Sequence, residues 1–274
     1  VKDRVVLITG ACGGIGREHA LEFGRRGAKV VVNDLGSNVR GDGTSDLAAN
    51  VAAEIVAHGG SAVSNDFSVA DPDEAKAMVQ QAIDEFGRID IVINNASAIN
   101  LMSTEMLTMK NYDLMHTINT RGTFLCSKLA IPHLKQAENP HVLNLSPPLN
   151  MEARWFQNHV AYTMAKFGMS MCVLGMSEEF ANLGIAFNAL WPKTTIATAA
   201  VANIVGGEPV LRRSRSAKIM GDAAHAILIR ESASFSGNFC IDEDVLREEG
   251  CHDLSKYRVD PAITEEELFP DFFI

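Results

Sequence analysis

The sequence lacks the features that assign a chain to several special classes of protein. Its five cysteines are widely spaced and no two form a Cys-X-X-Cys pair, which excludes the common zinc and redox motifs. Acidic residues outnumber basic ones by 34 to 24, and a formal net charge of −10 argues against a nucleic-acid binder and against attraction to an anionic membrane surface. No apolar run approaches the roughly 18 residues that a membrane span needs. We therefore predict no metal site, no nucleic-acid partner and no membrane span.

The first residues also lack a secretory signal, because the charged stretch Val1-Lys2-Asp3-Arg4 is followed only by a short apolar run. The thiols fit a reducing compartment, so a cytoplasmic location is predicted. Hydrophobic residues make up 47% and charged residues 21% of the 274 residues, which is typical of a globular chain with enough apolar material for a large core.

Short apolar runs alternate with helix-length segments along the whole chain. The runs are nearly continuous and rich in Val, Ile and Leu, as expected for strands that are buried on both faces. Strands are predicted at Val5–Thr9, Lys29–Asn33, Ser61–Asp66, Ile89–Asn94, His141–Ser146, Ile185–Leu190 and Asn238–Asp242. Helices are predicted near residues 15–26, 45–58, 72–86, 104–116, 121–136, 160–182 and 221–229.

This alternation predicts an α/β fold, a Rossmann-type doubly wound parallel sheet of about seven strands with crossover helices on both faces. No linker, repeat or low-complexity stretch divides the chain, so residues 1–274 are predicted to form a single domain. Pro192 to Arg215 is the one long connection, and long connections in compact domains are often lids. We therefore predict a lid over about residues 192–215.

A glycine cluster lies between the first predicted strand and the first predicted helix. Glycines let the backbone turn sharply and approach a pyrophosphate, and the following helix N-terminus offers unpaired N–H groups and a positive dipole end. The strand before the cluster and the helix after it are the context that such a loop requires. A tight turn without a ligand is the alternative. The residues predicted to contact a dinucleotide here are Gly10, Cys12, Gly13, Gly14, Ile15 and Gly16.

Two aspartates end neighbouring predicted strands. Asp34 follows the second strand, eighteen positions after Gly16, where a carboxylate accepts the ribose hydroxyls of NAD and repels the 2′-phosphate of NADP. Cys12 and Gly13 provide no basic side chain for such a phosphate, so NAD is the predicted cofactor. Asp66 and Phe67, after the third strand, are predicted to lie near the adenine. A turn or helix-capping role is the alternative for both aspartates.

Several ordered motifs resemble those of the short-chain dehydrogenase/reductase family, and the resemblance covers nearly the whole chain. Thr9–Gly16 fits its TGxxxGxG pattern, and Asn94-Asn95-Ala96-Ser97 resembles its NNAG motif with serine in place of glycine. Asn119 fits the catalytic asparagine, and Tyr162-Thr163-Met164-Ala165-Lys166 fits YxxxK. Pro192 to Thr198 resembles PGxxxT, with Lys193 replacing glycine and one residue added.

The resemblance implies further cofactor contacts from Asn94, Ala96, Ser97, Pro192 and either Thr195 or Thr198, for which helix capping is an equal alternative. It also implies a homodimer or homotetramer, with the helices near residues 104–136 and 160–182 packing across two-fold axes. A peroxisomal or mitochondrial location is compatible with the family.

The YxxxK spacing places Tyr162 and Lys166 on one face of a helix. A nearby ammonium stabilises a phenolate and lowers the pKa of tyrosine from its usual value of about 10. Together with a nicotinamide cofactor, the pair predicts interconversion of a secondary alcohol and a ketone. By resemblance, Asn119 holds a water that relays protons to Lys166. A surface pair on an amphipathic helix and a capping asparagine are the alternatives.

The third member of the family's catalytic set is altered. Alignment of Asn144-Leu145-Ser146-Pro147 with the family's NxSS pattern places Pro147, which has no donor, at the catalytic serine. Ser146, one residue away, is predicted to take the role, with Asn150 as the alternative donor. A strand-end hydroxyl that bonds its own backbone is the structural alternative. The functional alternative is a non-catalytic NAD-binding or lipid-binding protein.

The substrate class is left open between several hydrophobic alcohols and ketones. The second half resembles hydroxysteroid dehydrogenase-like members of the family, and the first half, at Val31–Gly36, resembles the dehydrogenase part of peroxisomal multifunctional enzymes. A steroid-like compound and a 3-hydroxyacyl thioester both fit. Arg212, Arg213 and Arg215 form either a coenzyme A phosphate site or a solvated face. The methionines predicted to form either an adaptable pocket wall or ordinary core are Met102, Met106, Met109 and Met115.

Overall fold

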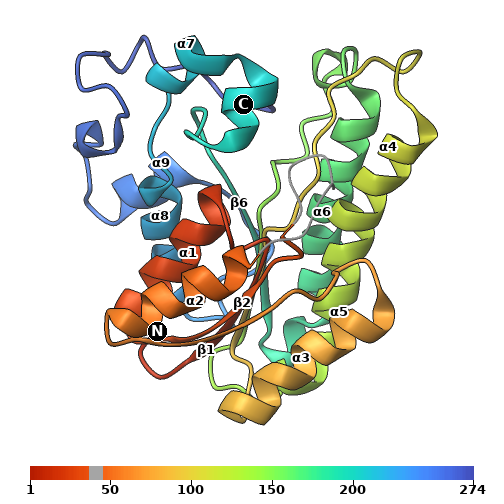
Figure 1. Ribbon diagram of the computed structural model, residues 1–274, viewed down its shortest axis with the longest axis vertical. Helices are drawn as coiled ribbons and strands as arrows, with labels where there is room; N and C mark the ends of the chain where they lie inside the picture. The colour runs from red at the N-terminus through yellow and green to blue at the C-terminus, as the bar shows by residue number, and fades with distance from the viewer. Residues whose placement is uncertain (37–45) are drawn as a thin grey trace.

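Seven strands form one parallel sheet in the computed structural model, which describes residues 1–36 and 46–274 (Figure 1). Their order is β3-β2-β1-β4-β5-β6-β7, and the direction of winding reverses between β1 and β4. In such sheets ligands bind outside the carboxyl ends of the strands at the point of reversal. The strands are β1 Val5–Thr9, β2 Lys29–Asn33, β3 Ser61–Asn65, β4 Ile91–Asn94, β5 His141–Asn144, β6 Ala186–Trp191 and β7 Phe239–Ile241.

Helices cover both faces of the sheet, which is why every residue of β1, β4, β5 and β6 is buried. Figure 1 shows α1, α2, α8 and α9 over one face and α3, α5 and α6 over the other. The helices are α1 Gly14–Arg25, α2 Leu47–Ala57, α3 Pro72–Phe86, α4 Met109–Met115, α5 Thr123–Leu134, α6 Val160–Glu179, α7 Gly207–Arg212, α8 Lys218–Leu228 and α9 Asp242–Glu248. None of the helices in the described part of the chain combines the length and hydropathy of a membrane span.

The predicted fold class is confirmed, and most predicted elements occur within a few residues of their predicted bounds. The helix predicted over 104–116 is shorter, because the Thr108 side chain caps α4 by accepting from the Asn111 N–H, and a π-helix, His116–Gly122, follows it. Residue 45, where the second helix is predicted to begin, lies outside the described residues. Helices α7 and α9 are short and were not predicted.

The lid segment, residues 192–215, contains a π-helical turn and α7 and is covered by the end of the chain. We define the C-terminal segment as residues 249–274. Its backbone pairs with the lid segment: Thr195 N–H donates to the Phe269 carbonyl (2.9 Å), and Asp271 N–H donates to the Lys193 carbonyl (3.0 Å). Thr194 and Pro270 form an antiparallel bridge between them. The C-terminal segment is therefore tied above the carboxyl ends of the strands.

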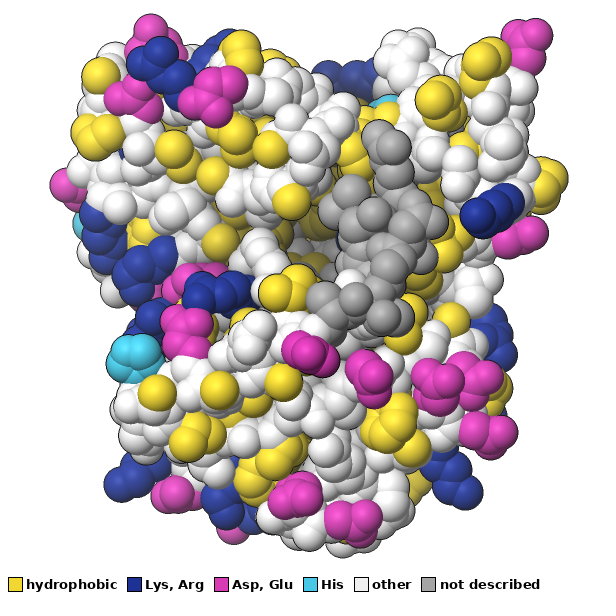
Figure 2. Space-filling view, viewed as in Figure 1, with side chains coloured by type: hydrophobic (Ala, Val, Ile, Leu, Met, Phe, Trp, Pro, Cys, Tyr) yellow, Lys and Arg dark blue, Asp and Glu magenta, His cyan; other side chains and the backbone are white. Residues whose placement is uncertain are grey.

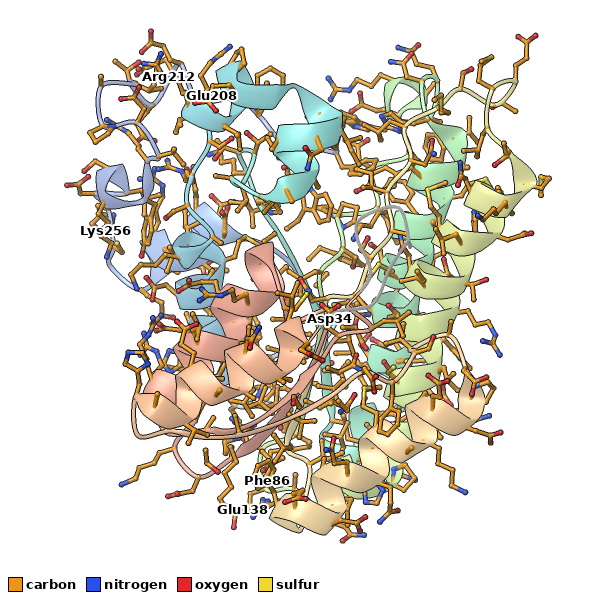
Figure 3. The ribbon with its side chains drawn as sticks, in the orientation of Figure 1. Asp34, Phe86, Glu138, Glu208, Arg212 and Lys256 are labelled. Atoms are coloured by element: carbon orange, nitrogen blue, oxygen red, sulfur yellow. The ribbon has the colours of Figure 1, made fainter. Side chains whose placement is uncertain are left out.

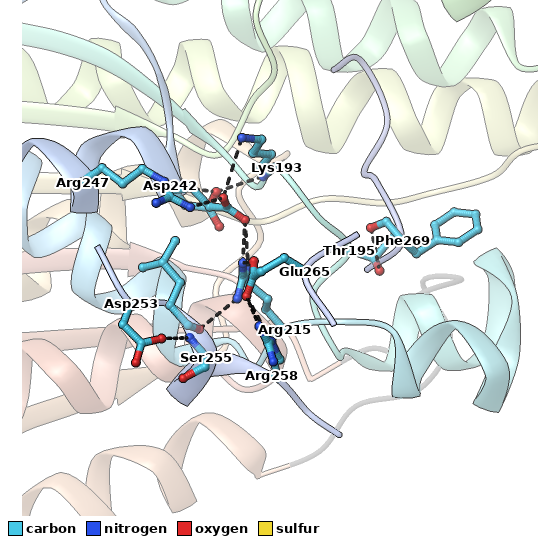
Figure 4. Close-up of polar contacts among 12 residues, drawn as sticks. Lys193, Thr195, Arg215, Asp242, Arg247, Asp253, Ser255, Arg258, Glu265 and Phe269 are labelled. Atoms are coloured by element: carbon cyan, nitrogen blue, oxygen red, sulfur yellow. Dashed lines mark hydrogen bonds and ion pairs between the residues drawn. The ribbon is translucent and has the colours of Figure 1, made fainter. Parts of the chain in front are cut away.

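The three arginines of the lid segment do not form one basic cluster: Arg212 and Arg213 are exposed, as in the solvated-face alternative, whereas Arg215 is buried. Arg212 pairs with Asp260 at 2.6 Å, and Arg213 lies over the Phe269 ring at 5.5 Å from its centroid. Arg215 is fully buried and pairs with Glu243 at 2.9 Å and with Glu265 (Figure 4). Each arginine therefore contacts a different part of the structure, and all three hold the C-terminal segment against the lid segment.

Candidate active site

Two adjoining cavities lie outside the carboxyl ends of the strands. The larger has a volume of about 310 Å³ and the smaller about 190 Å³. Five residues line both and so connect them: Ile15, Asn95, Ser97, Thr198 and Ala200. The space-filling view shows a hollow near the centre of this face, with hydrophobic side chains (yellow) among the atoms at its edge (Figure 2).

The glycine loop forms one wall of the larger cavity. A Cβ at Gly16 would lie 2.1 Å from the Gly10 carbonyl oxygen, so only glycine allows this close approach of α1 to the loop. At Gly13, in contrast, a Cβ would meet nothing within 4 Å, and this open space belongs to the cavity. Within the described residues, no side chain caps the N-terminus of α1. The loop therefore has both the room and the N–H donors that a phosphate needs.

The Asp34 carboxylate is held at the wall of the larger cavity by the backbone. Cys12 N–H donates to its Oδ2 at 3.0 Å, and Gly36 N–H donates to its Oδ1 at 2.9 Å. Figure 3 shows Asp34 near the middle of the molecule, at the opposite end of the sheet from Phe86 and Glu138. Burial, helped by Asp34, raises the pKa of the Cys12 thiol to about 12, so this thiol is neutral. The Asp34 carboxylate is thus fixed where it can receive further donors from the cavity.

Most of the predicted cofactor residues line one of the two cavities. The lining residues among them are Gly10, Cys12, Gly13, Gly14, Ile15, Asp34, Phe67, Ala96, Ser97 and Thr198 in the larger cavity and Pro192 in the smaller. Of the two threonines left open, Thr198 faces both cavities. Thr195 is buried elsewhere, with its Oγ1 bonded to Ser214 Oγ at 2.7 Å.

Three other predicted cofactor residues line neither cavity: Gly16, whose place in the loop is steric, Asp66 and Asn94. Asp66 is exposed beyond the end of β3. Asn94 is buried, and its Nδ2 donates to Asn144 Oδ1 at 2.8 Å and to Ser127 Oγ at 3.0 Å, so it connects β4 to β5 and α5. The next residue, Asn95, lines both cavities, and its Nδ2 donates to the Gly10 carbonyl at 2.8 Å. Of the two asparagines in this motif, Asn95 and not Asn94 lines the cavities, and the cofactor contact of Asn94 stays a prediction.

Tyr162 and Lys166 both reach the smaller cavity from α6. Lys166 Nζ donates to the Leu145 carbonyl at 3.0 Å and lies 5.3 Å from the centroid of the Trp191 ring. Burial lowers the pKa of Lys166 to about 8 and raises the pKa of Tyr162 above its usual range. We predicted a lowered pKa for Tyr162, but burial and, after it, the negative charge of Asp271 raise this pKa. Tyr162 is therefore a neutral phenol at physiological pH.

Asn119 lies in the π-helix His116–Gly122 and is fully buried. Its Oδ1 accepts from the Ala98 N–H at 2.8 Å, and its Nδ2 donates to the Ala98 carbonyl at 3.0 Å. π-Helical turns within helices are frequent at functional sites. Both polar atoms of the Asn119 side chain thus bond the backbone of Ala98, after β4. Any contact between this π-helical turn and a proton-relay water would therefore be made by the backbone of the turn.

None of the three residues considered for the altered serine position, Ser146, Pro147 and Asn150, lines the smaller cavity. Ser146 is fully buried, lines neither cavity, and its Oγ has no hydrogen-bond partner among the described residues. The Pro147 carbonyl accepts from Ser170 Oγ at 2.6 Å. Asn150 is also off the wall, and its side chain bonds Glu152. The assignment of Ser146 or Asn150 as the polarising donor stays a prediction.

Sequence reasoning missed the contribution of the C-terminal segment to the smaller cavity. Asp271 and Phe272 line it together with Tyr162. The Phe272 and Tyr162 ring centroids are 6.4 Å apart, and Trp191 Nε1 donates to the Phe272 carbonyl at 2.8 Å. Nothing in the local sequence signals this placement, because it depends on the pairing with the lid segment. Met115 is core, whereas Met102, Met106 and Met109 are exposed and line neither cavity.

Known proteins with similar sequences and structures cover the whole chain. The sequence profile named "short chain dehydrogenase" matches residues 4–208. Hydroxysteroid dehydrogenase-like protein 2 of Danio rerio is 51% identical over 271 residues, and the human protein of that name is 46% identical over the same length. Both alignments cover 98% of this chain but only 63% of the relative, so the chain spans less than two thirds of the length of these relatives.

Among solved structures, a putative dehydrogenase from Xanthomonas campestris is 42% identical, with a TM-score of 0.92 and coverage of 100% of this chain and 98% of that one. A 7α-hydroxysteroid dehydrogenase solved with NADH, 24% identical with a TM-score of 0.77 over 88% of this chain and 92% of its own, shares the fold. The likeness to hydroxysteroid dehydrogenase-like proteins, predicted for the second half, extends over both halves. The separate likeness of the first half to multifunctional enzymes stays a prediction.

Proposed function

Because the chain belongs to the short-chain dehydrogenase family, we propose that it is an NAD-dependent oxidoreductase that interconverts a secondary alcohol and a ketone on a hydrophobic substrate. The observation that carries this proposal is the junction of the two cavities. The glycine loop and Asp34 line one, Tyr162 and Lys166 line the other, and five residues are common to both.

The residues present fit a nicotinamide dinucleotide. The open space at Gly13 and the uncapped N-terminus of α1 suit the pyrophosphate, and the Asp34 carboxylate suits the ribose hydroxyls. Bound there, the cofactor would supply or accept a hydride. Phe67 and Val69 provide apolar wall beside Asp34. No basic side chain lines the larger cavity within the described part of the chain, which favours NAD over NADP.

The chain's own part in the reaction is to hold the substrate and move a proton. Tyr162, as a neutral phenol, gives its proton to the ketone oxygen during reduction and takes it back during oxidation. Lys166 adds positive charge beside the phenolate that forms, which lowers the energy of the charged state. Apolar side chains make up most of the wall around the pair, including Ile99, Leu145, Trp191 and Val205, and these suit a hydrophobic substrate.

The second candidate function is a non-catalytic NAD-binding or lipid-binding protein. The observation that favours it is the serine position, where neither Ser146 nor Asn150 lines the smaller cavity. The two functions are separated by an assay of purified protein with NADH or NAD and a panel of hydrophobic ketones and alcohols, including steroids and 3-hydroxyacyl thioesters. Turnover of at least one pair supports the oxidoreductase. Binding of the nucleotide without any turnover supports the second candidate.

The cofactor preference leads to a prediction at Asp34. We expect Asp34→Ala to narrow the preference for NAD over NADP by roughly 1–3 kcal/mol, the scale of a hydrogen bond to a charged group. Calorimetric titration of both nucleotides measures this difference. Asp66→Ala is the matched control, because Asp66 is exposed and off the cavity wall. Equal affinity of the unchanged protein for both nucleotides would contradict the assignment.

Assembly into a homodimer or homotetramer is also proposed. On α6, Met169, Val173 and Met176 are buried, whereas Met171 and Leu174 are 56% and 54% exposed. Phe124 on α5 is 50% exposed, so both helices carry apolar side chains that a partner subunit would bury. Met171→Glu should shift the mass measured by light scattering at micromolar concentration toward that of the monomer. Ile229→Glu, 48% exposed but outside these helices, should not. A monomeric unchanged protein would contradict the proposal.

A further inference from the structure

The smaller cavity contains an acidic group that the proposed reaction has not yet used. Reduction of a ketone benefits from a second hydrogen-bond donor to the carbonyl oxygen, besides the group that delivers the proton. Pro147 cannot provide it, and Ser146 and Asn150 are off the cavity wall. Asp271 does line that wall, together with Tyr162 and Lys166.

The backbone holds Asp271 in this place from both sides. Its N–H donates to the Lys193 carbonyl at 3.0 Å, and the preceding Pro270 forms the antiparallel bridge with Thr194. On the other side, the Phe272 carbonyl accepts from Trp191 Nε1 at 2.8 Å. The backbone on both sides of Asp271 is therefore held in place, which gives its side chain a defined direction.

The carboxyl group of Asp271 is arranged to be a donor. Its Oδ1 accepts from the Phe272 N–H at 2.7 Å, and Oδ2 receives no hydrogen bond from the described residues. No ion pair within 4.0 Å joins it to Lys166 in the described part of the chain, because Lys166 Nζ donates to the Leu145 carbonyl instead. A proton is therefore best placed on Oδ2, the oxygen that does not accept from the backbone.

The surroundings bring the pKa of Asp271 into the neutral range. Burial is the main cause that raises the pKa to about 7; the negative charge of Asp242 also acts to raise it, whereas the Phe272 N–H bond and Lys166 act to lower it. Burial raises the pKa of Tyr162, and Asp271 adds to this rise only in its ionised form. A carboxylic acid kept neutral by an apolar site is a hydrogen-bond donor.

We propose that Asp271 is a further catalytic residue, whose protonated carboxyl group hydrogen-bonds the substrate carbonyl oxygen in place of the missing serine. This proposal rests on the proposed function. Asp271 keeps its proton throughout: during reduction Tyr162 transfers its own proton to the oxygen, and Asp271 only stabilises the negative charge that develops there. The C-terminal segment would therefore complete the active site rather than merely cover it.

Substitutions at Asp271 separate a donor from a structural role. Asp271→Ala should lower kcat/KM for ketone reduction by about 10²-fold, the effect of removing one such donor. Asp271→Asn keeps an N–H donor and an oxygen for the Phe272 N–H, so it should remain within about tenfold of the unchanged protein. Glu266→Ala, at an exposed acid of the same segment, is the matched control and should change nothing.

The pH profile is the second readout. In the unchanged protein the rate of reduction should fall as pH rises through about 7, because the donor loses its proton there. The fall near pH 7 should disappear in Asp271→Asn, whose amide does not titrate, and only the fall at higher pH, where Lys166 loses its proton at about 8, should remain. A purely structural role for Asp271 predicts the same profile in both. The same profile, or a loss of activity carried by Ser146→Ala and absent from Asp271→Ala, overturns the proposal.

A third readout does not depend on turnover. 2-Decanone labelled with ¹³C at its carbonyl is bound to the protein with NAD, where reduction cannot occur. A hydrogen bond from Asp271 should move the carbonyl resonance downfield, and Asp271→Ala should move it back toward the free value. If no ketone in the panel turns over, the proposed function fails, and this resonance still decides the role of Asp271. A resonance that is unshifted in the unchanged protein overturns the inference.

Discussion

Tyr162→Phe is expected to lower kcat/KM for ketone reduction by roughly 10²–10⁴-fold, the range that general acid–base groups contribute. The substitution removes only the hydroxyl that delivers the proton. The ring remains, and it packs with Phe272 and Phe273 at centroid distances of 6.4 Å, so the fold of the smaller cavity should persist. Steady-state rates with the best ketone of the panel measure the loss.

Nucleotide affinity separates this loss from a disturbed fold. Tyr162 does not line the larger cavity, so fluorescence titration should give nearly the same NADH affinity in the variant and in the unchanged protein. Tyr257→Phe is the matched control: Tyr257 is also buried, but its hydroxyl donates to Asp222 at 2.7 Å, outside both cavities. It should alter stability slightly and activity not at all. An undiminished rate of ketone reduction in Tyr162→Phe would contradict the proposed mechanism.

The elements that sequence reasoning predicted well are those set by local pattern. β1, β2 and α3 begin and end at the predicted residues, since a continuous apolar run defines each strand and Asp71 with Pro72 marks the start of α3. The glycine loop was predicted equally well, because the need for glycine in it is steric and involves only a few residues. Both cases rest on contacts between residues close in the sequence.

The parts that were not predicted depend on distant contacts. Asp271 follows Tyr162 by more than one hundred positions, and only the pairing of the C-terminal segment with the lid segment brings the two together. Arg215 is buried, unlike Arg212 and Arg213, and this likewise depends on its ion pair with Glu243, which lies later in the sequence. The spacing of charged residues in the sequence does not distinguish the buried Arg215 from the exposed Arg212 and Arg213.

The largest effect on stability is expected at this buried arginine. Arg215→Met should lower the free energy of unfolding by about 3–5 kcal/mol, the usual result when one partner of a buried ion pair is removed. Arg215 is fully buried and Glu243 almost so, and the two are 2.9 Å apart. The substitution leaves the Glu243 carboxylate without its main partner, whereas Glu265, which is 40% exposed, can still be solvated.

Urea unfolding measures the loss, and two further variants identify its cause. Arg212→Met breaks an ion pair whose arginine is 60% exposed, so it should change the free energy of unfolding by about 0–1 kcal/mol. The double variant Arg215→Met with Glu243→Met removes both buried charges and should recover much of the loss, because apolar side chains of similar volume replace buried pairs well. A loss below about 1 kcal/mol in Arg215→Met would show that Glu243 readily finds water or a proton.

The same variant connects stability to the active site. Arg215 Nη1 donates to the Leu254 carbonyl at 2.9 Å, so the side chain holds the C-terminal segment by its backbone as well as by charge. Loosening this segment should displace Asp271 and Phe272 from the smaller cavity and leave the glycine loop in place. Arg215→Met should therefore lose ketone reduction well below its unfolding midpoint while it still binds NADH, and activity and nucleotide affinity measured across a urea series should separate. If both are lost together with the fold, the C-terminal segment and the sheet unfold as one unit.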